Sequence, residues 1–317
     1  MILKDKSFSL SDVPKVLYEN RYCNQKGLSF LACGGQDANG LLTNQVLEVK
    51  IPSFEVAEFP TMAKPHSYLR VAAISSKMFA IVNSVDVCGK LGNCFTSVEV
   101  YSEITKSWRY KYINVKEQLY YCLCSFMNKL YIIGGQDFRY KSIRSCNTYD
   151  ISSATWNKVT YLNEARNRAA CTVFEGKIVI TGGQDYHRLK SVESYDHYEN
   201  KWTFLPDMIE TRHSHAAVSM GNKMFVIGGY KTTSCEVFDS FSGNFTEIKS
   251  GLKVCDVKDS WYFDAFCIGH YIVVLHSFSR YSETIINLYD ACENKWSTIE
   301  CDFAKNLFGS SYVKYYA

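Results

Sequence analysis

The residues best spaced to bind a metal ion in this chain are two histidines one residue apart, His213 and His215. Alternate residues of a strand face the same side, so the two imidazoles could share one metal ion. Histidines at such positions more often line a rim or bond to backbone groups. Cys122 and Cys124 have the same strand spacing, but no second closely spaced cysteine pair completes a zinc site. We therefore expect no metal and no cofactor.

Three aspartates offer a second kind of chemistry. The segment Gly-Gly-Gln-Asp occurs three times and ends at Asp37, Asp137 and Asp185. The acids could be ligands for a cation in a central channel. The favoured interpretation is a turn in which each carboxylate accepts hydrogen bonds from local backbone N–H groups, because acids far apart in sequence need not converge.

A repeated unit positions these residues. Three apolar runs, residues 130–135, 178–183 and 224–229, each close on a glycine pair, and the pairs are 48 and 46 residues apart. A period in this range is typical of repeat architectures. Similar but altered runs occur at residues 28–35, 78–84 and 271–277, where the last two lack the glycine pair.

Each unit also carries two bulky residues seven positions apart. The pairs are Tyr101 and Trp108, Tyr149 and Trp156, Tyr195 and Trp202, Phe238 and Phe245, and Tyr289 and Trp296, with Val49 and Val56 in the first unit. Their large flat surfaces suit packing between repeated sheets. We therefore expect structural and not catalytic roles for these residues.

The units predict an all-β fold, a six-bladed β-propeller with four antiparallel strands per blade. The first unit begins at its second strand, and the segment 309–316 follows the last tryptophan without a partner. This C-terminal strand is expected to complete blade one and so close the ring, which removes exposed edges. Residues 1–26 are interpreted as a leader or a linker remnant, and residues 27–317 as one propeller domain.

Composition excludes several functional classes. The net charge of +3 is too small to indicate nucleic-acid binding, and no run of 18 apolar residues predicts a membrane span. The thirteen cysteines are odd in number and scattered, and charges interrupt the start of the chain. This pattern favours reduced thiols in a cytoplasmic protein.

The apolar run with Gly-Gly, followed by Tyr and Trp, resembles the repeat of the Kelch family over about residues 27–316. The segments 166–170 and 215–223 are most similar to those of Kelch-like proteins. The resemblance implies a substrate adaptor of Cullin-RING ubiquitin ligases. Such adaptors carry BTB and BACK domains ahead of the propeller, and neither is found in this sequence. We therefore expect Cullin binding only if those domains lie upstream.

The resemblance also implies a bowl-shaped binding face. In Kelch propellers the loops between the second and third strands share one face with the loops that join blades. Arginine and aromatic side chains, which are enriched at binding hot spots, gather in these loops, and arginine can pair bidentately with a carboxylate. The candidate partner-binding residues are Gln136, Phe138, Arg139, Tyr140, Arg166, Asn167, Arg168, Gln184, Tyr186, Arg188, Arg212, His213, Ser214, Tyr230, Lys231, Trp261, Tyr262 and Phe308.

We expect these residues to bind an acidic or phosphorylated peptide stretch of a protein partner. The alternative is that the arginines are solvated rim charges or pair with Asp137 and Asp185. Two other functions resemble those of known Kelch proteins. One is binding of actin filaments, and the other is a Kelch-type copper oxidase. No catalytic constellation accompanies the His-x-His pair, so we expect a non-enzymatic interaction module.

Overall fold

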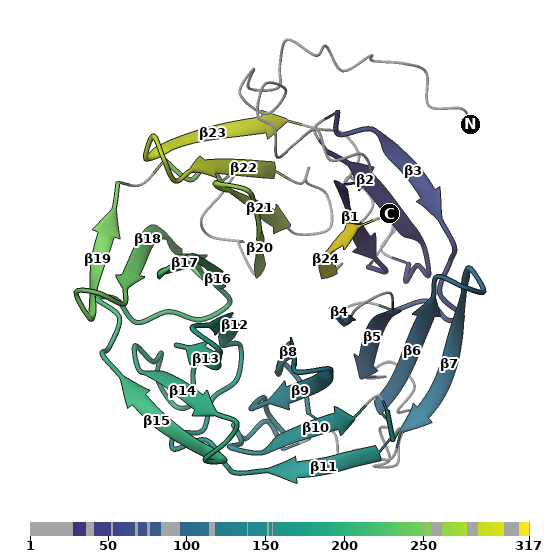
Figure 1. Cartoon of the computed structure of the whole chain (residues 1–317), viewed down its shortest axis with the longest axis horizontal. Coiled ribbons are helices and arrows are strands. Elements are labelled where there is room, and N and C mark those ends of the chain that lie inside the picture. Colours follow the sequence, from purple (N-terminus) through teal and green to yellow (C-terminus); the bar gives the residue numbers. More distant parts are fainter. Residues whose placement is uncertain are drawn as a thin grey trace.

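The computed structural model describes residues 28–35, 41–51, 53–66, 69–74, 77–83, 96–113, 118–137, 139–150, 152–153, 155–249, 251–254, 262–277, 285–300 and 311–316. Every regular element in these residues is a β-strand, and the strands form six four-stranded antiparallel sheets arranged around an axis (Figure 1). No helix in the described residues could cross a membrane. The predicted all-β propeller with antiparallel sheets is confirmed.

Five sheets each come from one continuous stretch of the chain. The first two of these sheets consist of β4 (Arg70–Ile74), β5 (Lys77–Asn83), β6 (Thr96–Ser102) and β7 (Ser107–Ile113), and of β8 (Cys122–Phe126), β9 (Lys129–Ile133), β10 (Cys146–Asp150) and β11 (Thr155–Val159). The next two consist of β12 (Ala170–Phe174), β13 (Lys177–Thr181), β14 (Val192–Asp196) and β15 (Lys201–Leu205), and of β16 (Ala216–Met220), β17 (Lys223–Gly229), β18 (Thr232–Asp239) and β19 (Asn244–Ile248). The fifth consists of β20 (Tyr262–Ile268), β21 (Tyr271–Ser277), β22 (Ile285–Asp290) and β23 (Lys295–Glu300).

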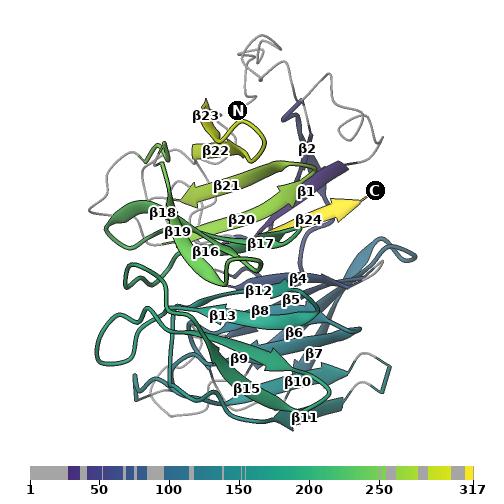
Figure 2. The same ribbon diagram turned by 60° about the vertical axis from the view of Figure 1, so that its left-hand side comes forward.

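The sixth sheet joins the two ends of the chain. It consists of β24 (Ser311–Tyr316), β1 (Leu28–Cys33), β2 (Val46–Lys50) and β3 (Val56–Phe59). β24 lies beside β1 in antiparallel register (Figure 2), so the predicted pairing of the C-terminal strand with the first unit is confirmed. The innermost strands β4, β8, β12, β16, β20 and β24 contact their neighbours in turn around the axis. The division of the chain at residue 27 stays a prediction, because residues 1–27 lie outside the described part.

The hydrophobic core lies between neighbouring sheets, and the aromatic pairs seven residues apart belong to it. Tyr195 and Trp202 sit opposite each other on β14 and β15, with ring centroids 5.1 Å apart. Both are buried in one cluster with Tyr131 and Ile133 of the preceding sheet. The fixed spacing therefore records a direct cross-strand contact that seals one sheet against the next.

Candidate functional site

The loops after each second strand and the loops between sheets meet at one face of the ring. Gln136 N donates to Leu119 O at 2.8 Å, and Gln184 N donates to Asn167 O at 2.9 Å. Tyr230 N donates to His213 O at 2.9 Å in the same way. We call the surface of residues 118–121, 136–137, 139–142, 166–168, 184–188, 212–215 and 230–231 the loop face. The structure thus brings the two predicted classes of loop together.

Two of the predicted contact residues do not reach the surface. The guanidinium of Arg166 is buried, donates to Gly182 O at 2.7 Å and pairs with Glu193 Oε1 at 2.8 Å. Arg212 is buried in the same way against Gly228 O and Glu236. The prediction that these two arginines contact a partner is wrong. Their proposed pairing with Asp137 and Asp185 is also wrong, because the buried acids are glutamates of the third strands.

The buried glutamates explain this arrangement. Glu193 also accepts hydrogen bonds from the backbone N–H groups of Asn163 and Glu164, at 2.8 and 3.1 Å. Glu99 repeats the arrangement with a histidine, since it accepts from Ala63 N and lies 3.2 Å from His66 Nε2. A buried carboxylate therefore holds each of these turns between sheets, and an arginine or a histidine lies against it within hydrogen-bonding distance.

Three more predicted residues are mostly structural. Asn167, His213 and Ser214 are all buried, and Asn167 Nδ2 donates to Ser142 Oγ at 2.8 Å. These contacts connect the loops to one another and hold the loop face in shape.

His213 and His215, weighed above as possible metal ligands, make structural contacts. His215 is buried with its Nε2 2.7 Å from Thr181 Oγ1. Within the described residues neither His213 nor His215 belongs to a cluster of three metal-ligating side chains. The hydrogen-bonded interpretation of these histidines therefore fits the structure better than a shared metal ion.

The aspartate of the Gly-Gly-Gln-Asp segment forms the expected turn at Asp137. Its Oδ1 accepts hydrogen bonds from Arg139 N at 2.9 Å and Lys141 N at 3.0 Å, so the turn interpretation is confirmed for this residue. Asp37 lies outside the described residues.

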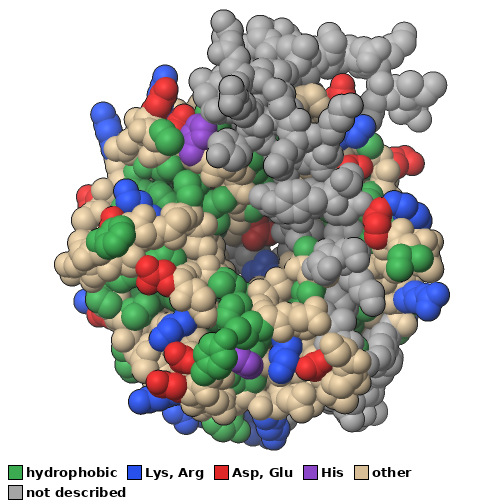
Figure 3. Space-filling model, in the orientation of Figure 1, with side chains coloured by type: hydrophobic (Ala, Val, Ile, Leu, Met, Phe, Trp, Pro, Cys, Tyr) green, Lys and Arg blue, Asp and Glu red, His purple; other side chains and the backbone are tan. Residues whose placement is uncertain are grey.

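The ring encloses a small central cavity. Figure 3 shows a hollow there, with acidic and basic side chains in view. The cavity measures about 190 Å³ and is lined by inner-strand residues that include Arg70 and Asp264. It is smaller than the roughly 300–1,000 Å³ of typical ligand pockets, so we place the candidate site on the loop face instead.

Cations and aromatic rings alternate over part of the loop face. The guanidinium of Arg168 lies 4.4 Å from the ring centroid of Tyr120. Arg188 and Lys231 lie 5.5 and 5.1 Å from the ring of Tyr230, which also stacks on His213 with centroids 5.1 Å apart. Rings at these distances orient cations and limit their freedom, which lowers the entropic cost of binding an anion.

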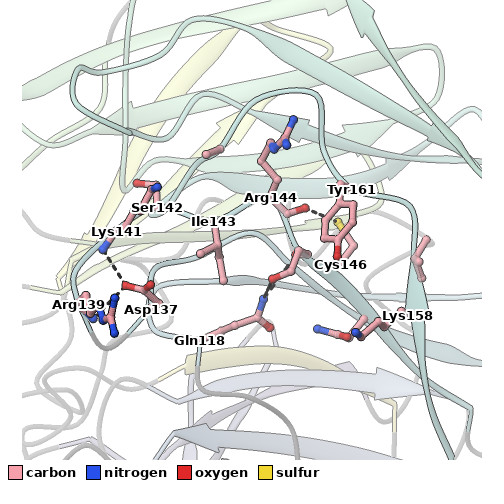
Figure 4. Close-up of a pocket in the computed structure, with 14 residues that line it drawn as sticks. Gln118, Asp137, Arg139, Lys141, Ser142, Ile143, Arg144, Cys146, Lys158 and Tyr161 are labelled. Atoms are coloured by element: carbon pink, nitrogen blue, oxygen red, sulfur yellow. Dashed lines mark hydrogen bonds between the residues drawn. The ribbon is translucent and has the colours of Figure 1, made fainter.

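A groove of about 820 Å³ extends the loop face over the β8–β11 sheet (Figure 4). Its lining includes Arg139, Lys141, Arg144 and Lys158, and Asp137 is the one acid among the described lining residues. The volume lies within the usual range of ligand pockets. The groove therefore offers a cationic surface large enough for a peptide segment.

A buried amide lies at the inner wall of this groove. Gln118 donates from Nε2 to Ser145 Oγ at 2.6 Å, and its Oε1 accepts no hydrogen bond in the structure. A buried acceptor without a partner is costly, so a ligand N–H placed there would gain stabilisation. Gln118 and Lys158 were not predicted, because the fold brings them together from a loop between sheets and from the outer strand β11.

Some of the remaining predicted residues lie in the described part of the chain, and others lie outside it. Tyr140 and Tyr186 are exposed at 79% and 84% and extend from loops of the loop face. Tyr262 begins β20. Phe138, Trp261 and Phe308 lie outside the described residues.

The environment of His213 predicts a pH dependence of stability. Burial, with the nearby charges of Arg168 and Arg188, lowers the pKa of His213 to about 4. The unfolded chain, with a histidine pKa near 6.5, therefore binds more protons below about pH 6.5 than the folded protein does. The free energy of unfolding should fall by about 1–2 kcal/mol between pH 7 and pH 5 through this residue.

Urea unfolding at these two pH values measures the effect. The variant His213→Gln should lose less stability on acidification than the wild type. Identical losses in both proteins would contradict this assignment.

Comparison with known proteins shows which family and which proteins this chain is similar to. The family model described as the KLHDC2/KLHL20/DRC7 Kelch-repeats domain matches residues 97–275. Kelch-like protein 38 of Mus musculus is 28% identical over 218 residues, which cover 68% of this chain and 34% of that protein. Kelch-like protein 23 of Homo sapiens is 32% identical over 141 residues, or 43% of this chain and 24% of that protein.

A viral protein is similarly related. Kelch repeat protein C2 of Camelpox virus (strain CMS) is 28% identical over 145 residues, which cover 45% of this chain and 28% of that protein. The match thus spans about a third or less of the length of these relatives. The residues that form the loop face all lie within the 97–275 match.

Proposed function

This chain belongs to the Kelch-repeat family, and from that premise we propose that its propeller binds an acidic segment of a partner protein on the loop face. The propellers of Kelch-like proteins are generally protein-interaction modules. We further infer that the six sheets act as six blades of one closed, non-enzymatic ring. Delivery of the partner to a Cullin-RING ubiquitin ligase, which the resemblance implies, would need BTB and BACK domains in addition to this propeller.

The observation that carries the proposal is that the cation–aromatic contacts of the loop face lie next to the cationic groove. Tyr120, under the Arg168 guanidinium, is two residues from Gln118 on the groove wall. An extended acidic segment could therefore place carboxylates against the basic side chains and one backbone N–H on Gln118 Oε1. Electrostatic complementarity of this kind gives an interface its specificity and a fast association rate.

The test is a double charge reversal, Arg168→Glu with Arg188→Glu. A tagged wild-type propeller captures partners for mass spectrometry, and binding of the captured partner is then measured by calorimetry. Charge-assisted contacts contribute about 1.5–3 kcal/mol each, so the double variant should bind at least about 100-fold more weakly. The reversal Lys201→Glu on the outer strand β15 is the matched control and should bind normally.

Arg212 is left intact in this test, because reversal of a buried charge would unfold the protein. Capture by the double variant equal to that of the wild type would refute the proposal. Co-sedimentation with filamentous actin is a separate arm. Sedimentation that survives the double reversal would indicate the cytoskeletal alternative on another surface.

A further inference from the structure

An aspartate closes the third strand of four sheets and has the same role in each. Its Oδ1 accepts a hydrogen bond from the backbone N–H two residues later, at 2.8–2.9 Å. The four residues are Asp150, Asp196, Asp239 and Asp290. This Asx turn fixes the carboxylate, and the second oxygen of the group is left for other contacts.

In two sheets a lysine balances that second oxygen. Lys129 Nζ lies 3.6 Å from Asp150 Oδ2, and Lys177 Nζ lies 3.0 Å from Asp196 Oδ2. Lys129 pairs with Asp150 across the ladder, and Lys177 and Asp196 are the residues next to the ladder pair Ile178 and Tyr195. In the β20–β23 sheet the residue paired with Asp290 is the buried Tyr271, so no lysine occupies this place.

Two metal-ligating side chains stand there instead. His270 Nε2 lies 3.7 Å from Asp290 Oδ2, and the three ligand atoms of His270, Asp290 and Cys292 all lie within 4.8 Å of one another. His270 belongs to the β20–β21 turn and Cys292 to the β22–β23 turn. A backbone bond from Ala291 N to His270 O, at 3.0 Å, ties the two turns together.

We propose that His270, Asp290 and Cys292 bind a zinc ion. Imidazole, carboxylate and thiolate together match zinc, whereas magnesium and calcium require oxygen ligands. Bond lengths of about 2.0–2.3 Å place tetrahedral ligands roughly 3.3–3.6 Å apart. The observed histidine–aspartate distance is close to this, and the exposed Cys292 thiol needs a shift of roughly 1.5 Å at most.

The surroundings suit a site with three protein ligands and one water. The turn N–H groups of Cys292 and Glu293 hold Asp290 Oδ1 at 2.8 and 3.1 Å, which orients Oδ2 as an outer hydrogen-bond shell does in known sites. The His270 ring packs on Tyr271 with centroids 4.2 Å apart. Cys292 is the exposed thiol among the described cysteines, so water can complete the coordination.

The site lies at the β20–β21 and β22–β23 turns, whereas the loop face is built from loops that follow second strands and loops that join sheets. Zinc would cross-link the two hairpins in the place where lysine–aspartate pairs act in other sheets. Sequence reasoning missed this site because its ligands come from two hairpins that only the fold brings together. The proposal does not depend on the function proposed for the loop face.

Calorimetric titration of the reduced, metal-free protein with Zn²⁺ tests the site. The expected result is one tightly bound equivalent and a higher melting temperature. Cys292→Ser and His270→Asn should each weaken binding by more than the roughly 10- to 100-fold caused by loss of an outer-shell partner. The substitutions follow the chain itself, because Ser152 and the turn asparagines Asn128 and Asn222 stand at the corresponding places.

Controls make the outcome decisive. His187→Asn removes an exposed histidine of the loop face and should bind zinc as the wild type does. Cobalt should give the charge-transfer band of a cobalt–thiolate bond in the wild type and not in Cys292→Ser. No stoichiometric zinc in the wild type, or zinc retained by both ligand variants, would overturn the proposal. Equal affinity for calcium or magnesium would overturn it as well.

Discussion

Replacement of Arg166 by methionine should lower the free energy of unfolding by about 3–5 kcal/mol, in spite of the similar length of the side chain. The variant leaves the Glu193 carboxylate buried without its 2.8 Å cationic partner. It also removes the Arg166 Nη1 donor from the Gly182 carbonyl, at 2.7 Å, and one of two donors from the Ser191 carbonyl, which Arg166 Nη1 and Gly182 N both reach at 3.0 Å. Urea unfolding monitored by tryptophan fluorescence measures the loss.

The chain supplies a matched control two residues away. Arg168→Met changes a half-buried arginine of the same loop whose guanidinium lies over Tyr120, and should lower stability by about 1 kcal/mol, clearly less than Arg166→Met. The double variant Arg166→Met with Glu193→Leu should recover much of the loss, since neither charge is then buried alone. A loss below about 1 kcal/mol in the single variant would show that Glu193 is solvated.

The contrast between Arg166 and Arg168 shows where sequence reasoning ends. Both lie in one loop, and the sequence correctly predicts that this loop meets the loops that follow the second strands. Residue type does not reveal which side chain turns inward, because that depends on a buried partner in the next sheet. A signal was present: Glu193 and Glu236 stand two residues before an aromatic position, and Asn147 and Asn287 occupy the same place elsewhere. A strand glutamate at this place therefore marks a loop that contributes a buried basic side chain, which is an arginine for Glu193 and Glu236 and a histidine for Glu99.

The periodic features were predictable for a physical reason. Tyr195 and Trp202 must be seven residues apart to face each other across a hairpin, so their spacing appears directly in the sequence. The residues that line the groove do not recur at a fixed spacing in the sequence. Gln118, Arg144 and Lys158 come from a loop between sheets, a loop within a sheet and an outer strand. The fold alone places them in one surface, and that surface carries the proposed specificity.

Replacement of Gly182 by alanine should lower the free energy of unfolding by about 3 kcal/mol. Gly182 has a φ of +53°, and a Cβ there would lie 2.5 Å from the carbonyl oxygen of Arg212. The left-handed conformation costs an alanine about 1–2 kcal/mol. The carbonyl cannot move aside freely, because it accepts the 2.9 Å hydrogen bond from Gly183 N that joins two sheets. Weakening that bond adds about 1 kcal/mol.

Gly176→Ala separates the two contributions. Gly176 has a φ of +72° in the β12–β13 turn, and no atom lies within 4 Å of the position of its Cβ. This variant should show only the conformational cost of about 1–2 kcal/mol. The excess loss in Gly182→Ala then measures the close approach of neighbouring sheets at the glycine pair. If the two variants lost equal stability, the glycine pairs would serve backbone conformation alone, and contact between sheets would not explain their recurrence.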